Sequence, residues 1–112
     1  FQYIIFGDIL NKILMSDMLD ENKIKENLAS LDGWIIKKNL LYKKFSFKTF
    51  MSAFSFMNII ADQSDKVDHH PKLINEYNIV EIELFTHSSN SITNKDFSLA
   101  KFIDNIYNEI FS

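Results

Sequence analysis

Cysteine is absent from this chain of 112 residues, so the chain has neither disulfides nor thiolate metal sites. This absence is compatible with a reducing compartment, and we expect a cytoplasmic protein. No apolar run approaches the ~20 residues that span a bilayer, and no secretory signal pattern stands out. With a net charge of −3 and no basic block, the chain is not expected to bind nucleic acid as its main task.

What is present fits one folded domain. Hydrophobic residues make up 46% of the chain and charged residues 24%, which is ordinary for a soluble globular protein. The apolar residues of positions 1–18 follow no single period, so we treat this stretch as an N-terminal extension of uncertain structure, with an extra strand or helix possible. Residues 19–112 show no linker or repeat and are predicted to form a single domain.

Near the start of that domain, the pattern predicts a helix and then a hairpin. Asp20 is expected to cap a helix over about residues 21–31, and Gly33 to stop it. Two strands are predicted at residues 34–37 and 40–45, with Lys38-Asn39 at the turn, although asparagine without glycine is a weak turn signal.

A longer helix is predicted from about Phe47 to Lys66, with Ser46 as its cap. One apolar stripe at helical spacing is expected to face the core, namely Phe50, Ala53, Phe54, Met57, Ile60 and Ala61. A second apolar set lies off that stripe and comprises Met51, Phe56 and Ile59. This second set would form either a subunit contact or the flank of the core.

The remaining segments predict a second hairpin and a last helix. Strands are expected at residues 73–77 and 80–86, and the second strand alternates apolar and polar residues as in a sheet covered on one face. Thr93 and Asp96 are arranged as in a capping box, ahead of the apolar stripe Leu99, Ile103, Ile106 and Ile110. The predicted fold is α+β, a four-stranded antiparallel sheet with three helices packed on one face, in the order α-β-β-α-β-β-α.

All three histidines lie in two short stretches, His69-His70 before Pro71 and His87 after the alternating strand. Histidine can donate or accept a proton near neutral pH, because its unperturbed pKa is about 6.5. Proline disfavours the helical conformation for the residue before it, so the long helix is expected to stop before the histidine pair. The three residues could form one proton-transfer site, or they could be unrelated surface histidines.

Other chemistries fit the sequence less well. Adjacent histidines on an extended chain point to opposite sides, so His69 and His70 would not easily share one metal ion. The chain also lacks the His-x-x-x-His spacing favoured by zinc, the Gly-x-Ser-x-Gly elbow of serine hydrolases and a glycine-rich phosphate loop. We therefore expect no metal, which leaves metal-free acid–base chemistry or no chemistry.

Several of these motifs occur together in one known family. They are Gly33-Trp34, Phe47-Lys48-Thr49-Phe50, Asp68-His69-His70-Pro71, Tyr77-Asn78, Thr86-His87 and Asp96-x-x-Leu99-Ala100. In this order the combination resembles the pattern of the pterin-4a-carbinolamine dehydratases, over about Leu19 to Phe111. Each motif alone would be a weak signal.

The resemblance implies a 4a-hydroxytetrahydrobiopterin dehydratase, which removes water from a 4a-hydroxytetrahydropterin to give the quinonoid dihydropterin in tetrahydrobiopterin recycling. It implies no metal or organic cofactor. Matches to the family's two substrate segments are Asp68, His69 and His70 in the first and Phe85, Thr86, His87 and Ser88 in the second. We expect His69 and His87 to transfer protons and His70 to hold the pterin.

Three further residues have two interpretations each. Asp96 is a helix-capping residue, an acidic group beside the histidines that favours their protonated form, or both. Trp34 would wall the pterin pocket or pack in the core. Asp65 is better explained as a solvated helix-end residue than as part of the site.

The sequence departs from the family pattern at two positions, and the family suggests a second function. Ser91 stands where the family often has glycine, and Ser88 where an acidic residue is common. Some family members also bind a transcription factor through the long central helix, so a non-catalytic, coactivator-like binding module with an additional nuclear location is the alternative. In the family this helix also mediates oligomerisation, so the resemblance implies a homodimer or homotetramer.

Overall fold

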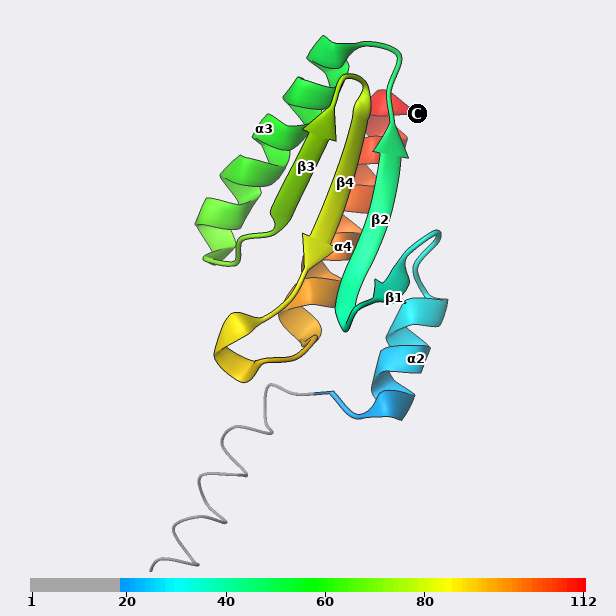
Figure 1. Cartoon of the computed structure of the whole chain (residues 1–112), viewed down its shortest axis with the longest axis vertical. Helices are drawn as coiled ribbons and strands as arrows, with labels where there is room; N and C mark the ends of the chain where they lie inside the picture. The colour runs from blue at the N-terminus through cyan, green and yellow to red at the C-terminus, as the bar shows by residue number, and fades with distance from the viewer. Residues whose placement is uncertain (1–18) are drawn as a thin grey trace, which may run out of the picture.

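A computed structural model describes residues 19–112, and the predicted N-terminal extension lies outside the described residues. The sheet has the strand order β1-β2-β4-β3, and all three neighbouring pairs are antiparallel. Figure 1 shows the sheet with its helices. Its elements are α2 (Glu21–Ala29), β1 (Ile35–Lys37), β2 (Leu40–Ser46), α3 (Phe50–Val67), β3 (Lys72–Glu76), β4 (Ile79–Leu84), the 3-10 turn η1 (His87–Ser89), α4 (Asn94–Ile106) and the π-helical turn η2 (Tyr107–Phe111). The predicted α+β class and element order are confirmed.

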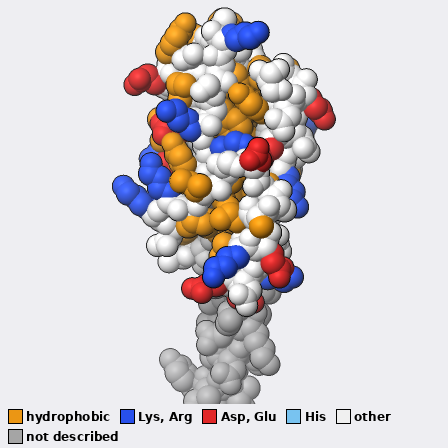
Figure 2. All heavy atoms as spheres, turned by 90° about the vertical axis from the view of Figure 1, so that its right-hand side faces the viewer, with side chains coloured by type: hydrophobic (Ala, Val, Ile, Leu, Met, Phe, Trp, Pro, Cys, Tyr) orange, Lys and Arg blue, Asp and Glu red, His pale blue; other side chains and the backbone are white. Residues whose placement is uncertain are grey.

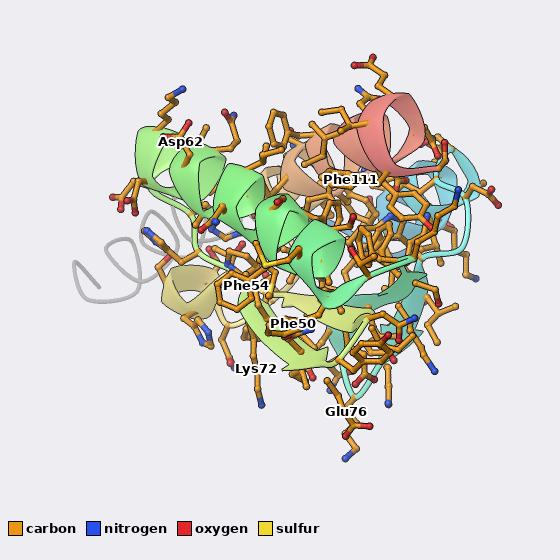
Figure 3. The ribbon with its side chains drawn as sticks, turned by 90° about the horizontal axis from the view of Figure 1, so that it is seen from above. Phe50, Phe54, Asp62, Lys72, Glu76 and Phe111 are labelled. Carbon is orange, nitrogen blue, oxygen red and sulfur yellow. The ribbon has the colours of Figure 1, made fainter. Side chains whose placement is uncertain are left out.

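The sheet has one covered face and one open face. Seen from above, α3 and α4 lie on the same side of the sheet, whereas Lys72 and Glu76 of β3 point away from the helices (Figure 3). On β4 the alternation is as predicted, because Val80, Ile82 and Leu84 are fully buried. They pack with Phe45, Phe56 and Ile103 in one hydrophobic core. The sheet therefore has one face in the core and one face open to solvent.

The first helix and hairpin largely follow the prediction. The Asp20 side chain accepts a hydrogen bond from the Lys23 backbone N–H, but the helix ends at Ala29 rather than near residue 31. The turn between β1 and β2 places Lys38 and Asn39 at φ values of 52° and 64°, the left-handed pair typical of a type I′ hairpin. Side chains of both charges surround apolar ones on the side of the molecule toward β1 and α2 (Figure 2).

The long helix begins later than predicted, and the predicted cap was wrong. Ser46 is still paired with Ile79 in the sheet, so it cannot be the N-cap residue of the helix. Instead Thr49 caps α3, with its side chain accepting a hydrogen bond from the Ser52 N–H at 3.0 Å. The cap position is decided by where the sheet pairing ends.

The core-facing stripe of α3 was predicted only in part. Ala53, Phe56 and Ile60 are fully buried, whereas Phe50 and Phe54 are 43% and 46% exposed. Of the second apolar set, Phe56 lies in the core, as one of its two alternatives expected, whereas Met51 is 70% exposed. Both faces of the helix are apolar, so its rotation is fixed by the sheet it meets and not by periodicity. A similar change of phase in η2 leaves Ile110 59% exposed at the end of the predicted last stripe.

Candidate active site

The junction between α3 and β3 fixes the histidine pair. The helix ends at Val67, before the pair, as predicted, and Asp68 follows in the left-handed conformation at φ 51° and ψ 47°. This residue reverses the chain direction, and the His69 backbone N–H then donates to the Ser64 carbonyl at 3.0 Å. His69 and His70 consequently leave the helix on an extended segment that leads into β3.

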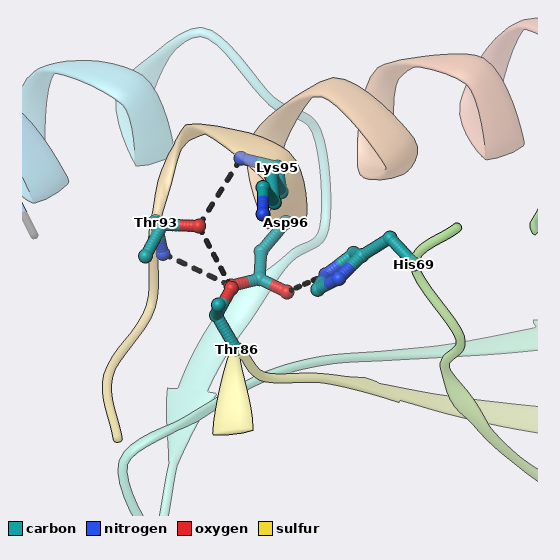
Figure 4. A network of polar contacts seen from close by, with 5 residues as sticks. All are labelled: His69, Thr86, Thr93, Lys95 and Asp96. Carbon is teal, nitrogen blue, oxygen red and sulfur yellow. Dashed lines mark hydrogen bonds and ion pairs between the residues drawn. The ribbon is translucent and has the colours of Figure 1, made fainter. Parts of the chain in front are cut away.

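His69 is held by a buried carboxylate from a distant part of the chain (Figure 4). Its Nε2 lies 2.6 Å from Asp96 Oδ1, and the His69 side chain is only 10% exposed while that of Asp96 is fully buried. The other carboxylate oxygen, Oδ2, accepts hydrogen bonds from Thr86 Oγ1 at 2.8 Å and from the Thr93 backbone N–H at 2.9 Å. Asp96 therefore caps α4, as one interpretation expected, and also contacts the imidazole of His69.

The direction of these hydrogen bonds determines the His69 tautomer. A carboxylate oxygen only accepts, so His69 must carry its proton on Nε2 to bond with Asp96. In the neutral ring Nδ1 then holds the free lone pair. Thr86 donates to Asp96, so the Thr93 hydroxyl, 2.7 Å from Thr86 Oγ1, donates to Thr86. The network thus presents His69 as a proton acceptor at one defined atom.

His70 and His87 are in different surroundings. His70 Nε2 lies 2.9 Å from Asp65 Oδ1, and both side chains are exposed. His87 is exposed in η1, and its ring meets that of Phe85 edge-on with centroids 5.3 Å apart. Within residues 19–112, His87 has no side-chain hydrogen bond. Its two nitrogens are thus accessible.

Two hollows divide the three imidazoles. His70 and His87 line a hollow of about 160 Å³ together with Leu40, Lys72, Glu83 and Phe85, which we call the histidine hollow. His69 lines a different hollow of about 270 Å³ between the end of α3 and the start of α4. Since His69 and His70 are adjacent on extended chain, their side chains point to opposite sides of it. The structure therefore brings His70 and His87 together and turns His69 to the other side.

The other expected site residues are distributed unevenly. Phe85 lies in the histidine hollow, and Thr86 is buried in the Asp96 network. Asp68 and Ser88 are exposed next to the histidines in sequence. Trp34 is 3% exposed, and its indole N–H donates to both carboxylate oxygens of Asp104 at 3.0 Å. Trp34 therefore packs in the core, the second of its two interpretations.

Asp65 contributes more than the sequence suggested. It is a solvated helix-end residue, as expected, with its side chain 83% exposed, and its carboxylate also contacts His70 at 2.9 Å. The sequence offered one signal for this contact, namely that Asp65 and His70 lie five positions apart across the end of α3. That spacing places the two side chains together only if the chain reverses, which depends on the left-handed Asp68.

Comparisons with known proteins show the family of this chain. The sequence profile of the family described as pterin 4 alpha carbinolamine dehydratase matches residues 17–106. A relative from Sulfolobus acidocaldarius is 47% identical over 88 residues, covering 79% of this chain and 97% of its own. One from Prochlorococcus marinus is 38% identical over 94 residues, covering 84% and 99% respectively. Both carry provisional names as pterin-4-alpha-carbinolamine dehydratases.

Two solved structures are also similar. The crystal structure of a transcriptional coactivator/pterin dehydratase from Brucella melitensis is 39% identical with a TM-score of 0.76, covering 79% of this chain and 96% of that one. A pterin dehydratase-like protein, described as a RuBisCO assembly factor in the alpha-carboxysome, is 20% identical with a TM-score of 0.55, covering 65% and 84%. The second similarity concerns the fold alone.

Proposed function

We propose that this chain, which belongs to the pterin 4 alpha carbinolamine dehydratase family, dehydrates a 4a-hydroxytetrahydropterin to the quinonoid dihydropterin, in the recycling of tetrahydrobiopterin. The observation that carries the proposal is the histidine hollow, which brings two imidazoles, His70 and His87, to one place on the open face of the sheet. Such a set suits a reaction that needs one proton donor and one proton acceptor.

The reaction requires only proton transfers. The bond between C4a and its hydroxyl oxygen breaks, and the oxygen leaves as water after accepting a proton from a general acid. A general base takes the proton from the adjacent ring nitrogen, whose electron pair then forms the new C=N double bond. Two imidazoles in opposite protonation states can supply both steps without a metal or organic cofactor.

The surroundings of each histidine support a division of roles. His69 is fixed in one tautomer by a buried carboxylate, the arrangement that orients an imidazole for proton transfer. His87 has both ring nitrogens accessible to a substrate in the histidine hollow. His70 is restrained by Asp65 and is suited to holding the pterin. We therefore propose proton transfer by His87 and substrate binding by His70 in the histidine hollow, with Phe85, Asp68 and Ser88 as further contacts. Proton transfer by His69, which lines the other hollow, requires that the pterin reach across the His69–His70 segment.

Steady-state dehydration assays on three alanine variants test this division. His69→Ala and His87→Ala should each lower kcat by about 10²-fold or more, the usual contribution of a general acid or base. His70→Ala should mainly raise KM. Wild-type dehydration at the uncatalysed rate would reject the enzyme, and an unchanged kcat in His69→Ala would reject the role of that residue.

A second candidate function rests on the outer face of α3. Phe50, Met51 and Phe54 are between 43% and 70% exposed on α3, away from the residues of that helix that are buried in the core. The Brucella melitensis relative is described as a coactivator as well as a dehydratase. We propose that this face is the contact in a homodimer or homotetramer, and alternatively that it binds another protein.

Sedimentation of wild type and Met51→Lys separates these uses of the α3 face. A homo-oligomer predicts a higher mass for wild type that falls in the variant, because a charge in an apolar contact is unfavourable. A monomeric wild type would exclude self-association and leave the face for another partner. Dehydratase activity in the same samples distinguishes a binding module from an enzyme.

A further inference from the structure

A second hollow adjoins the histidine hollow on the open face of the sheet. It has a volume of about 290 Å³ and is lined by Lys37, Lys38, Leu40, Tyr42, Lys72 and Glu83. We call it the lysine hollow. Leu40, Lys72 and Glu83 line both hollows. A molecule in the histidine hollow can therefore extend into the lysine hollow along the surface of the sheet.

The charge of the lysine hollow is mainly positive. Three exposed ammonium groups, from Lys37, Lys38 and Lys72, meet one carboxylate, Glu83, which leaves two positive charges in excess. Lys72 and Tyr42 both stand opposite Glu83 in the strand register, so the acidic group lies between them. Across residues 19–112, the three lysines take part in no ion pair. Their charge is consequently not neutralised within this part of the chain.

Tyr42 keeps the hollow free of a further negative charge and positions one lysine. Its hydroxyl donates to Glu81, and this bond, with burial and the nearby charges of Glu81 and Glu83, raises the pKa of Tyr42 to about 12. The phenol therefore stays neutral over the physiological range. Lys37 Nζ lies 4.5 Å from the centroid of the Tyr42 ring, a cation–π contact that holds the ammonium over the hollow.

We propose that the lysine hollow binds an anionic group, a phosphate or a carboxylate, on the side chain of the pterin whose ring occupies the histidine hollow. The inference rests on the proposed function and deepens it, because it names the substrate class as pterins with a charged side chain. Complementary charge next to an apolar and aromatic pocket is the usual way in which a site selects one member of a ligand class. The negative charge of Glu83 reduces the preference of the hollow for an anion.

Equilibrium binding of three probes to the full chain tests the proposal. The probes are 7,8-dihydropterins whose side chain at C6 is a neutral dihydroxypropyl, its phosphate ester, or an aminobenzoylglutamate. Wild type should bind at least one anionic probe more tightly than the neutral one, and added salt should reduce the difference. The phosphate and glutamate arms decide which anion the hollow prefers.

Charge variants provide the decisive comparison. Lys37→Gln and Lys38→Gln should each weaken binding of the anionic probe by about two- to fivefold, the range for exposed charge pairs, and leave the neutral probe unchanged. Glu83→Gln should act in the opposite sense and increase the preference for the anion. Lys44→Gln is the matched control, because Lys44 pairs with Glu81 on the same face of the sheet but lines neither hollow.

The outcomes separate this inference from the proposed function. Equal binding of neutral and charged probes by wild type would overturn the anion subsite, and so would an equal effect of Lys37→Gln on all probes. Dehydration of the neutral 4a-hydroxytetrahydropterin is measured on the same preparations. If it is catalysed, the dehydratase proposal stands whatever the charge preference is. If no probe binds, both proposals fail.

Discussion

Replacing Asp96 by asparagine changes one atom in the most buried polar group of the site. The carboxylate accepts hydrogen bonds from His69 Nε2, Thr86 Oγ1 and the Thr93 backbone N–H. An asparagine amide has one oxygen that accepts and one nitrogen that donates, so it cannot serve all three donors. The new N–H₂ group can point either toward His69 or toward Thr86 and Thr93.

The cost of each choice decides the orientation. If the N–H₂ group faces Thr93, a buried backbone N–H loses its acceptor, which costs about 1–3 kcal/mol. If it faces His69, the neutral imidazole can move its proton from Nε2 to Nδ1 and become the acceptor. The second orientation avoids the unpaired donor, so we expect it. In this orientation the hydrogen bonds to an ionised carboxylate become weaker bonds to a neutral amide. We therefore estimate that the free energy of unfolding falls by about 1–3 kcal/mol.

The expected functional effect of Asp96→Asn follows from the tautomer. With the proton on Nδ1, the atom that faces away from position 96 can no longer accept a proton. We therefore expect kcat to fall by about 10²-fold or more. Long-range ¹H–¹⁵N NMR of the imidazoles reads the tautomer directly, steady-state kinetics gives kcat, and urea unfolding gives the stability.

Asp104→Asn is the control for a general loss of stability. Asp104 lies two turns further along α4 and accepts hydrogen bonds from Trp34 and from Lys43 at 2.9 Å, remote from the histidines. This variant should lose stability and retain kcat. The reasoning would be refuted if Asp96→Asn moved the His69 proton and kept the wild-type kcat, or if both variants lowered kcat equally.

Three further predictions concern the fold. Phe56→Ala should destabilise the protein by about 3–5 kcal/mol because it empties a core site, whereas Phe54→Ala should cost much less; equal losses in urea unfolding would contradict the observed rotation of α3. Thr49→Ala should cost about 1 kcal/mol as a lost helix cap, and Ser46→Ala should cost little, which thermal unfolding can compare. The raised pKa of Tyr42 predicts stability that is fully present below pH 10 and lost as the pH rises toward 12. Tyr42→Phe should flatten this decline and should remove one late-ionising tyrosine from an ultraviolet titration. The same number of late-ionising tyrosines in wild type and variant would contradict the prediction.

Local signals in the sequence were sufficient for the elements of this fold. Asp20 and the Thr93–Asp96 capping box mark helix starts by hydrogen bonds between near neighbours, and both are present in the structure. The alternation along residues 80–84 likewise identified the buried face of β4, because a strand exposes every second side chain to the same environment. Such signals depend only on a few adjacent residues.

The sequence could not predict which face of α3 is buried. Phe50, Phe54 and Phe56 are chemically alike, and either apolar stripe satisfies a helical period. Only contact with the sheet decides that Phe56 is fully buried while Phe54 remains 46% exposed. The start of the helix was decided in the same way, by the pairing of Ser46 with Ile79.

For the site, the sequence by itself identified the candidate chemistry, and the tertiary structure decided the partners. Three histidines, Pro71 and Asp96 could be named from motifs, and the family resemblance placed Asp96 near the histidines. The sequence did not say that Asp96 binds His69, 27 positions away, or that His70 contacts Asp65. Both depend on the left-handed Asp68, which reverses the chain, and on the extended segment after it, along which adjacent side chains point to opposite sides. A sequence fixes which groups are available, whereas their mutual distances arise only when the sheet and helices pack together.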